Sequence, residues 1–169
     1  MNEPLRSAFA EPEPPLRSRR LAPLTVMIGS LATLVPVVST VPWLPPLGLI
    51  LLAGWRLLRS DVLRVWAAAP LGLFDDLVSG QPLGSSMLLW GMSFIALDML
   101  DMRLVWRDFW QDWLLASGTI AFCLIGGRLI AAPLGAHVDT ALALQIALSA
   151  ALYPVIARMC FALDAKGRP

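Results

Sequence analysis

Long uncharged stretches dominate the chain. The longest runs from Leu21 to Trp55, 35 residues without an acidic or basic side chain. As a single helix it would extend about 50 Å, beyond the roughly 30 Å hydrocarbon core of a bilayer. Pro42, Pro45 and Pro46 remove backbone donors in its second half. We therefore expect the chain to turn there and to cross a membrane twice within this stretch.

Further apolar stretches extend this pattern to six crossings and predict an all-α integral membrane protein, a six-transmembrane-helix bundle. The second crossing is short, and two alternatives stay open for it. Either it crosses fully, with Arg56 and Arg59 extending to the interface, or it inserts only partly. The predicted transmembrane domain is residues 21–163, with spans at residues 21–41, 43–58, 65–78, 83–100, 113–132 and 140–163.

Composition and the placement of charge support this fold. Hydrophobic residues make up 57% of the chain and charged residues 15%, which leaves too few polar side chains to cover a soluble domain. All but one of the 13 basic residues fall on the termini or on alternate loops, and the exception is Arg128. The positive-inside rule then predicts that both termini are cytoplasmic. We expect residues 1–20 to be a disordered basic tail and residues 164–169 a short C-terminal tail. A cleaved signal peptide is the rival interpretation of the N-terminal region.

Three charged residues fall inside predicted spans, where a charge costs about 2.5–3.5 kcal/mol at the bilayer centre. Asp75 and Asp76 lie near the outer end of the third span, and Arg128 lies near the outer end of the fifth. Asp76 and Arg128 come to a similar depth, so they could pair. Three interpretations stay open: a substrate, ion or proton site, a buried pair that fixes helix registry, or an aspartate that extends to the outer interface.

An aromatic stripe leads into the fifth span. Trp106, Phe109, Trp110 and Trp113 have the spacing of neighbours on one helix face, and charged residues are interleaved among them. The stripe predicts an aromatic belt at the membrane interface. The same surface is also a candidate dock for a partner, because Trp is a favoured interface anchor.

Small residues repeat at helical spacing in the sixth span, at Ala143, Ala147 and Ala151. Such rows let two helices approach closely. We expect this row to pack inside the bundle, with association to another subunit as the alternative.

Residues that carry catalysis or bind metals are scarce. His137 is the single histidine, and Cys123 and Cys160 both lie in apolar stretches. A zinc site needs three or four His, Cys or carboxylate ligands, and Ser79 has no candidate base beside it in the sequence. We predict no catalytic residue, metal, cofactor or nucleic-acid partner, and we do not expect an enzyme.

The stretch from Gly72 to Gly84 resembles the signature of the rod-shape-determining MreD family, in which a Gly, an Asp four residues on, a Ser-Gly or Gly-Gly turn and a Leu-Gly recur. The apolar helix that Pro46 opens and the late pair Tyr153-Pro154 fit the same family. Asp75 departs from the pattern, because an apolar residue is commoner there. The motif and turn residues of this chain are Gly72, Asp76, Gly80, Pro82 and Gly84.

The resemblance implies a fold similar to the substrate-binding subunits of energy-coupling-factor transporters. It also implies a non-enzymatic, multi-pass component of the bacterial inner membrane that supports peptidoglycan synthesis and cell shape. Its expected partner is a membrane-anchored protein of the MreC type. Through that partner it would act with the MreB filament, a RodA-type glycosyltransferase and a transpeptidase. The alternative is a transporter subunit that binds a small molecule, a vitamin or a metal.

Overall fold

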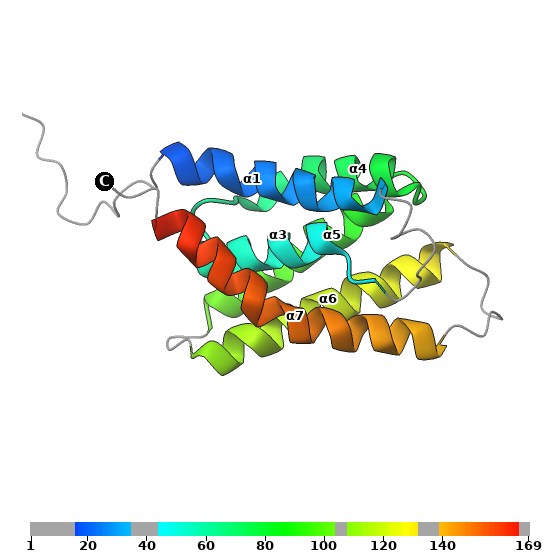
Figure 1. Cartoon of the computed structure of the whole chain (residues 1–169). Coiled ribbons are helices and arrows are strands. Elements are labelled where there is room, and N and C mark those ends of the chain that lie inside the picture. The colour runs from blue at the N-terminus through cyan, green and yellow to red at the C-terminus, as the bar shows by residue number, and fades with distance from the viewer. Residues whose placement is uncertain (1–15, 35–43, 104–107, 132–138, 166–169) are drawn as a thin grey trace, which may run out of the picture.

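The computed structural model describes residues 16–34, 44–103, 108–131 and 139–165, and in these ranges it contains helices and no strand (Figure 1). The predicted all-α class is therefore confirmed for the described part of the chain. The elements are α1 (Leu16–Leu31), η1 (Ala32–Leu34), α3 (Leu47–Leu58), η2 (Val65–Ala67), α4 (Ala68–Ser79), α5 (Ser85–Asp101), α6 (Phe109–Ala131) and α7 (Asp139–Ala165).

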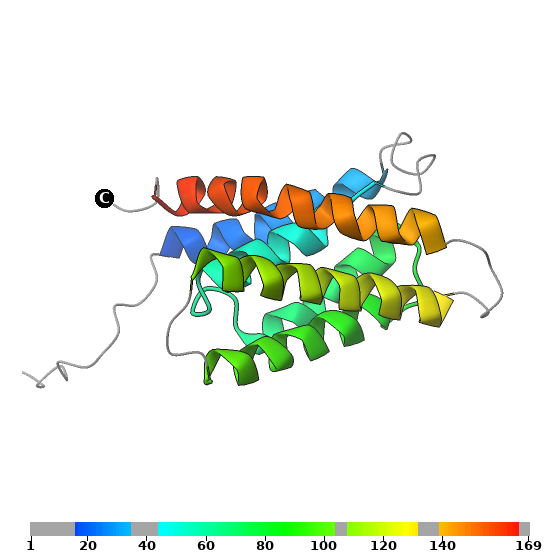
Figure 2. The same cartoon turned by 90° about the horizontal axis from the view of Figure 1, so that it is seen from below.

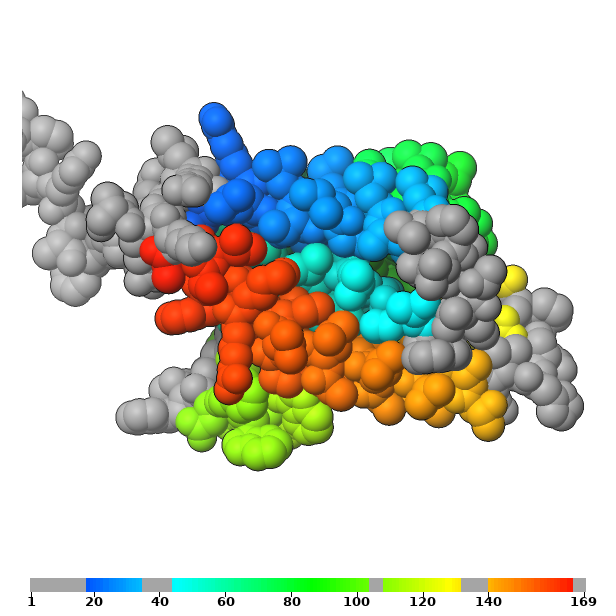
Figure 3. Space-filling model, viewed as in Figure 1, coloured from blue at the N-terminus to red at the C-terminus, as the bar shows by residue number. Residues whose placement is uncertain are grey.

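Helix α3 forms the centre of the bundle. Every residue from Gly48 to Leu57 is buried, and α1, α6 and α7 all pack against the helix. Figure 2 shows it enclosed when the bundle is turned, and in Figure 3 only a strip of α3 is visible between α1 and α7. Apart from Arg56, the helix is apolar on all sides, and such a helix suits the centre of a bundle because it has little polar surface to hydrate.

The buried position of α3 also encloses Arg56. Its side chain is 1% exposed and does not extend to the surface of the bundle. Its guanidinium instead contacts acidic side chains of α5.

Helices α6 and α7 are the two described helices that are long and apolar enough to cross a membrane. They lie side by side at the edge of the bundle (Figures 1 and 2), and most of their apolar surface is not covered by the rest of the described chain. By their length and composition these two helices weakly indicate a membrane protein.

The helix boundaries differ from the predicted ones at several ends. Helix α1 begins at Leu16, so the last five residues of the predicted disordered tail are helical. Helix α6 begins at Phe109, four residues before the predicted span, and α7 continues to Ala165, into the predicted C-terminal tail. Residues 1–15, 35–43 and 166–169 lie outside the described ranges, and so do the parts of the predicted tails and first two spans that fall on them.

The start of α1 and the end of α7 lie at the same end of the bundle (Figure 1). Ser18 is fully buried there, and its hydroxyl donates to the Asp164 carboxylate at 2.7 Å. Arg59, just after α3, approaches the same carboxylate at 3.6 Å. This contact places the two ends of the helical region beside each other.

Candidate functional site

The motif residues join α4 to α5, and Asp76 is the centre of the junction. Its carboxylate accepts the backbone N–H groups of Gly84 and Ser86, each at 2.8 Å. It also accepts the hydroxyl of Ser85 at 3.0 Å. The first N–H groups of a helix have no partner within the helix, so a carboxylate beside them acts as a cap and also interacts favourably with the helix dipole. Asp76 thus holds the start of α5 from the preceding helix.

The glycines of the motif meet the steric demands of this hairpin. A Cβ on Gly72 would lie 2.7 Å from the backbone N and Cα of Met87, so only glycine lets α4 and α5 approach this closely. Gly80 ends α4 with φ of 69°, and Gly84 precedes α5 with φ of 93°. Side chains other than glycine rarely adopt these angles. Between them the carbonyl of Pro82 accepts the N–H of Ser85 at 3.0 Å.

The structure does not form the pair of Asp76 with Arg128 that their similar depth had left open. Asp76 is 1% exposed and takes its hydrogen bonds from α5, and Arg128 forms no ion pair with a described residue. The prediction matched the depth of the two residues along their helices. Depth does not fix the direction in which a side chain points around its helix axis, and Asp76 points to α5.

The neighbouring Asp75 points away from Asp76 and toward α1. One carboxylate oxygen accepts the hydroxyl of Ser30 at 2.6 Å, and the other is 3.4 Å from the hydroxyl of Ser86. The two adjacent acids therefore face different helices and share only Ser86, which bonds Asp76 through its backbone N–H and Asp75 through its hydroxyl.

A cavity of about 350 Å³ lies beside the hairpin, at the end of the bundle opposite Ser18 and Asp164. Asp75 and Arg128 both line it, with Gln81, Trp90 and Gln145. The side-chain amide of Gln145 donates to the carbonyl of Leu44 at 2.8 Å and links α7 to the segment before α3. Asp75 and Arg128 are thus brought to one cavity without touching.

The sequence did not reveal a charged cluster at the other end of the bundle. The Nη2 atom of Arg56 contacts Asp98 directly and lies 3.4 Å from a carboxylate oxygen of Asp101. The central carbon of the guanidinium, Cζ, lies 5.6 Å from the centre of the Phe94 ring. The Nε and Nη1 atoms are buried without a partner in the described part of the chain. Arg56 lies near the end of the second predicted span, and Asp98 and Asp101 lie at the end of the fourth, on the same predicted side of the membrane. The depth argument that was applied to Arg128 would therefore have suggested that Arg56 pairs with these two acids.

A second ion pair lies near this cluster, in the segment after α3. The Arg59 guanidinium donates to both carboxylate oxygens of Asp61, at 3.2 and 2.8 Å. These hydrogen bonds lower the pKa of Asp61 below its usual 3.8 and raise the pKa of Arg59.

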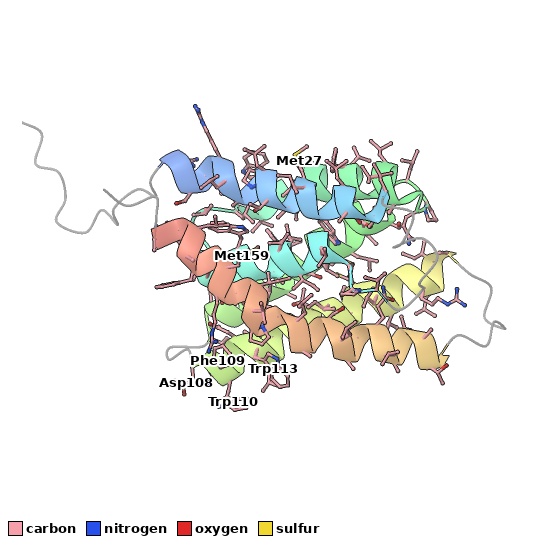
Figure 4. The ribbon with its side chains drawn as sticks, in the orientation of Figure 1. Met27, Asp108, Phe109, Trp110, Trp113 and Met159 are labelled. Carbon is pink, nitrogen blue, oxygen red and sulfur yellow. The ribbon has the colours of Figure 1, made fainter. Side chains whose placement is uncertain are left out.

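The aromatic stripe separates into an inner and an outer part. Phe109 and Trp110 are 57% and 69% exposed, and Figure 4 shows them at the edge of the bundle where α6 begins. Trp113 faces inward, and its indole N–H donates to the carbonyl of Ala150 on α7 at 2.9 Å. Trp106 lies outside the described residues.

The bond from Trp113 has a specific cause in α7. Pro154 lies inside that helix and has no N–H, so the carbonyl four residues earlier, that of Ala150, loses its usual helical partner. The indole of Trp113 supplies the missing donor from α6. Figure 1 shows α7 bent along its length, as expected for a helix with an internal proline.

The alanine row of α7 lies on the surface. Ala143, Ala147 and Ala151 are all exposed, so the expected packing of this row inside the bundle is wrong. The row faces away from the other described helices and is open to another chain or to lipid.

Comparisons with protein-family models, with curated proteins and with solved structures gave no match to this chain. The likeness to the MreD family therefore rests on the residues of the motif.

Proposed function

We propose that the chain is a non-enzymatic, multi-pass scaffold of the bacterial inner membrane that supports cell-wall elongation by binding a membrane-anchored partner of the MreC type. In this proposal the bundle crosses the bilayer six times with both termini in the cytoplasm, in a fold similar to the substrate-binding subunits of energy-coupling-factor transporters. The MreB filament, the RodA-type glycosyltransferase and the transpeptidase are reached through the partner.

The observation that supports this proposal is that the Asp76 carboxylate is fully engaged in hydrogen bonds within the turn. Its two carboxylate oxygens are occupied by donors at the start of α5, and Gly72, Gly80 and Gly84 serve the same turn. Because the Asp76 carboxylate forms hydrogen bonds within the turn, it stabilises the local fold and is not available for acid–base or nucleophilic chemistry. This supports a role in assembly.

The exposed alanine row supplies a surface for a partner helix. Inside a bilayer there is little hydrophobic gain from helix association, so close contact between small residues is the main source of affinity. Ala143, Ala147 and Ala151 present such a contact along α7. We propose that the single membrane helix of the partner packs against this row.

Co-purification tests the proposal. The chain and a candidate MreC protein from the same organism are co-expressed, extracted in mild detergent and purified through a tag on the chain. We expect the partner to be retained, and Ala147→Leu to reduce its yield about tenfold by blocking close approach. Ala96→Leu, the same change at an exposed alanine of α5, is the matched control and leaves the yield unchanged. Equal loss in both variants, or no retention by the unaltered chain, rejects the proposal.

The cavity beside the hairpin favours a second candidate, a small-molecule binding subunit. Its volume of about 350 Å³ lies within the range of ligand pockets, and such pockets orient their ligand with a few polar groups. Asp75 and Arg128 give it one acid and one guanidinium, which suit an organic molecule with both charges better than a metal ion. Mass spectrometry of the purified chain under native conditions tests this candidate. A retained small molecule that Arg128→Gln releases, without any MreC-type partner, favours it over the scaffold.

A further inference from the structure

A groove of about 470 Å³ lies between α1 and α4, near the ends at which both helices begin. Its walls are mainly apolar and include Met27 from α1 and Pro70 and Phe74 from α4. Figure 4 places Met27 at the margin of the bundle formed by α1, opposite the margin that carries Phe109 and Trp110. The groove is therefore separate from the aromatic stripe and from the cavity beside Asp75.

Two arginines line one end of this groove. Arg19 lies in the first turn of α1, and Arg64 directly precedes η2. Both side chains are exposed. Met27 lies about 12 Å beyond Arg19 along α1, by the rise of 1.5 Å per residue, and Phe74 lies in the middle of α4. The groove is thus basic at one end and apolar along the rest of its length.

The charges of Arg19 and Arg64 are not neutralised by the described chain. Arg56 contacts Asp98 and Asp101, and Arg59 pairs with Asp61. No comparable ion pair reaches Arg19 or Arg64 from any residue in the described ranges. The groove therefore presents two guanidinium groups that are available to an external anion.

Trp66 marks the level of this end relative to a bilayer. It lines the groove and is 70% exposed, and indole rings concentrate at the headgroup level of membranes. In the orientation proposed above this end faces the cytoplasm, where anionic lipids give the leaflet its negative surface potential.

We propose that this groove binds one anionic phospholipid of the cytoplasmic leaflet. The phosphodiester lies between Arg19 and Arg64, which donate charge-assisted hydrogen bonds to its oxygens. An acyl chain runs along Met27 and Phe74, and Trp66 packs at the glycerol level. The inference uses the membrane orientation proposed above but does not depend on the MreC-type partner.

Native mass spectrometry of the delipidated full chain in detergent tests this site. Phosphatidylglycerol and phosphatidylcholine with the same acyl chains are titrated separately. We expect one phosphatidylglycerol to bind about twentyfold more tightly, since each basic residue near an anionic lipid contributes roughly a fivefold gain. The double variant Arg19→Gln, Arg64→Gln should lose this preference. The matched control, Arg103→Gln with Arg158→Gln, changes two exposed arginines elsewhere and should keep it.

Two further measurements separate a seated lipid from general attraction to charge. Met27→Trp fills the groove and leaves both arginines in place, so it should abolish the tight adduct while the melting temperature stays unchanged. Inorganic phosphate at the lipid concentration should not displace phosphatidylglycerol. Equal binding of the two lipids, equal loss in the control variant, retained affinity in Met27→Trp, or displacement by phosphate each overturns the proposal. None of these outcomes bears on partner binding at the alanine row.

Discussion

Asp76 and Arg56 are each 1% exposed and lie at opposite ends of the bundle, yet their surroundings differ. Asp76 receives hydrogen bonds from the first residues of the helix that follows it. Arg56 depends on Asp98 and Asp101, some 40 residues away in the chain. The carboxylate is held by local backbone that forms whenever the hairpin forms, whereas the guanidinium needs two helices to be assembled first.

The largest expected effect comes from removing the acids around Arg56. We expect Asp98→Asn with Asp101→Asn to destabilise the bundle by about 3–5 kcal/mol, because a buried guanidinium is left without a counter-charge. Adding Arg56→Met should restore most of the loss. Unfolding in mixed detergent micelles measures all three variants. If the triple variant is no more stable than the double, the buried charge is not the cause.

Loss of the Asp76 cap should have the next largest effect. Asp76→Leu leaves the partly buried N–H groups of Gly84 and Ser86 without an acceptor, and we expect a loss of about 2–3 kcal/mol. Asp76→Asn keeps one acceptor oxygen and should cost less. A double-mutant cycle with Arg128→Met should give a coupling below about 0.5 kcal/mol. A larger coupling would restore the ion pair that the structure lacks.

A smaller effect is expected at the crossing of α4 and α5. Gly72→Ala places a methyl group against the backbone of Met87, and overpacking of this kind costs about 1–3 kcal/mol. Gly91→Ala is the matched control on α5, because a Cβ there meets no atom within 4 Å. The control should be neutral or slightly stabilising, since alanine favours helix more than glycine does. Similar melting temperatures for both variants would contradict the close crossing.

The smallest effect is a pH dependence at the Arg56 end of the bundle. The hydrogen bonds from Arg59 lower the pKa of Asp61 below 3.8, so the pair stabilises the folded state above the unfolded pKa. That contribution disappears as the pH falls through the lower folded value. Stability curves of the chain and of Asp61→Asn should therefore differ slightly at neutral pH and converge as the pH falls through the folded pKa of Asp61. Because Asp61 is exposed, the difference is small, and a gap that widens in acid would reverse the assigned sign.

Much of the helix pattern was available from the sequence. The third and fourth predicted spans match η2 with α4 and α5 to within two residues at each end, because the turn glycines and Pro82 mark the boundary. The positive φ angles at Gly80 and Gly84 also agree with the tight turn expected there. These features depend on residues close together in the chain.

The contacts that the sequence missed depend on direction around a helix axis. Asp76 and Arg128 lie at a similar depth along their helices, but their side chains do not point toward each other. Arg56 and Asp98 do point toward each other and form an ion pair. The beginning of α1 was missed for a related reason: four prolines and several charges precede it, and its stability comes from contacts such as that of Ser18 with Asp164. Tertiary contacts of this kind outweigh local composition.

The hydrogen bond from Trp113 to Ala150 has a consequence for biogenesis. A backbone carbonyl without a hydrogen-bond donor inside lipid costs several kcal/mol. Pro154 leaves the carbonyl of Ala150 without its helical donor within α7 itself. In the membrane orientation proposed above, helix α7 cannot settle alone at its final depth without that cost. We expect the last two helices to leave the insertion machinery as a pair, with the indole of α6 already positioned to shield its neighbour.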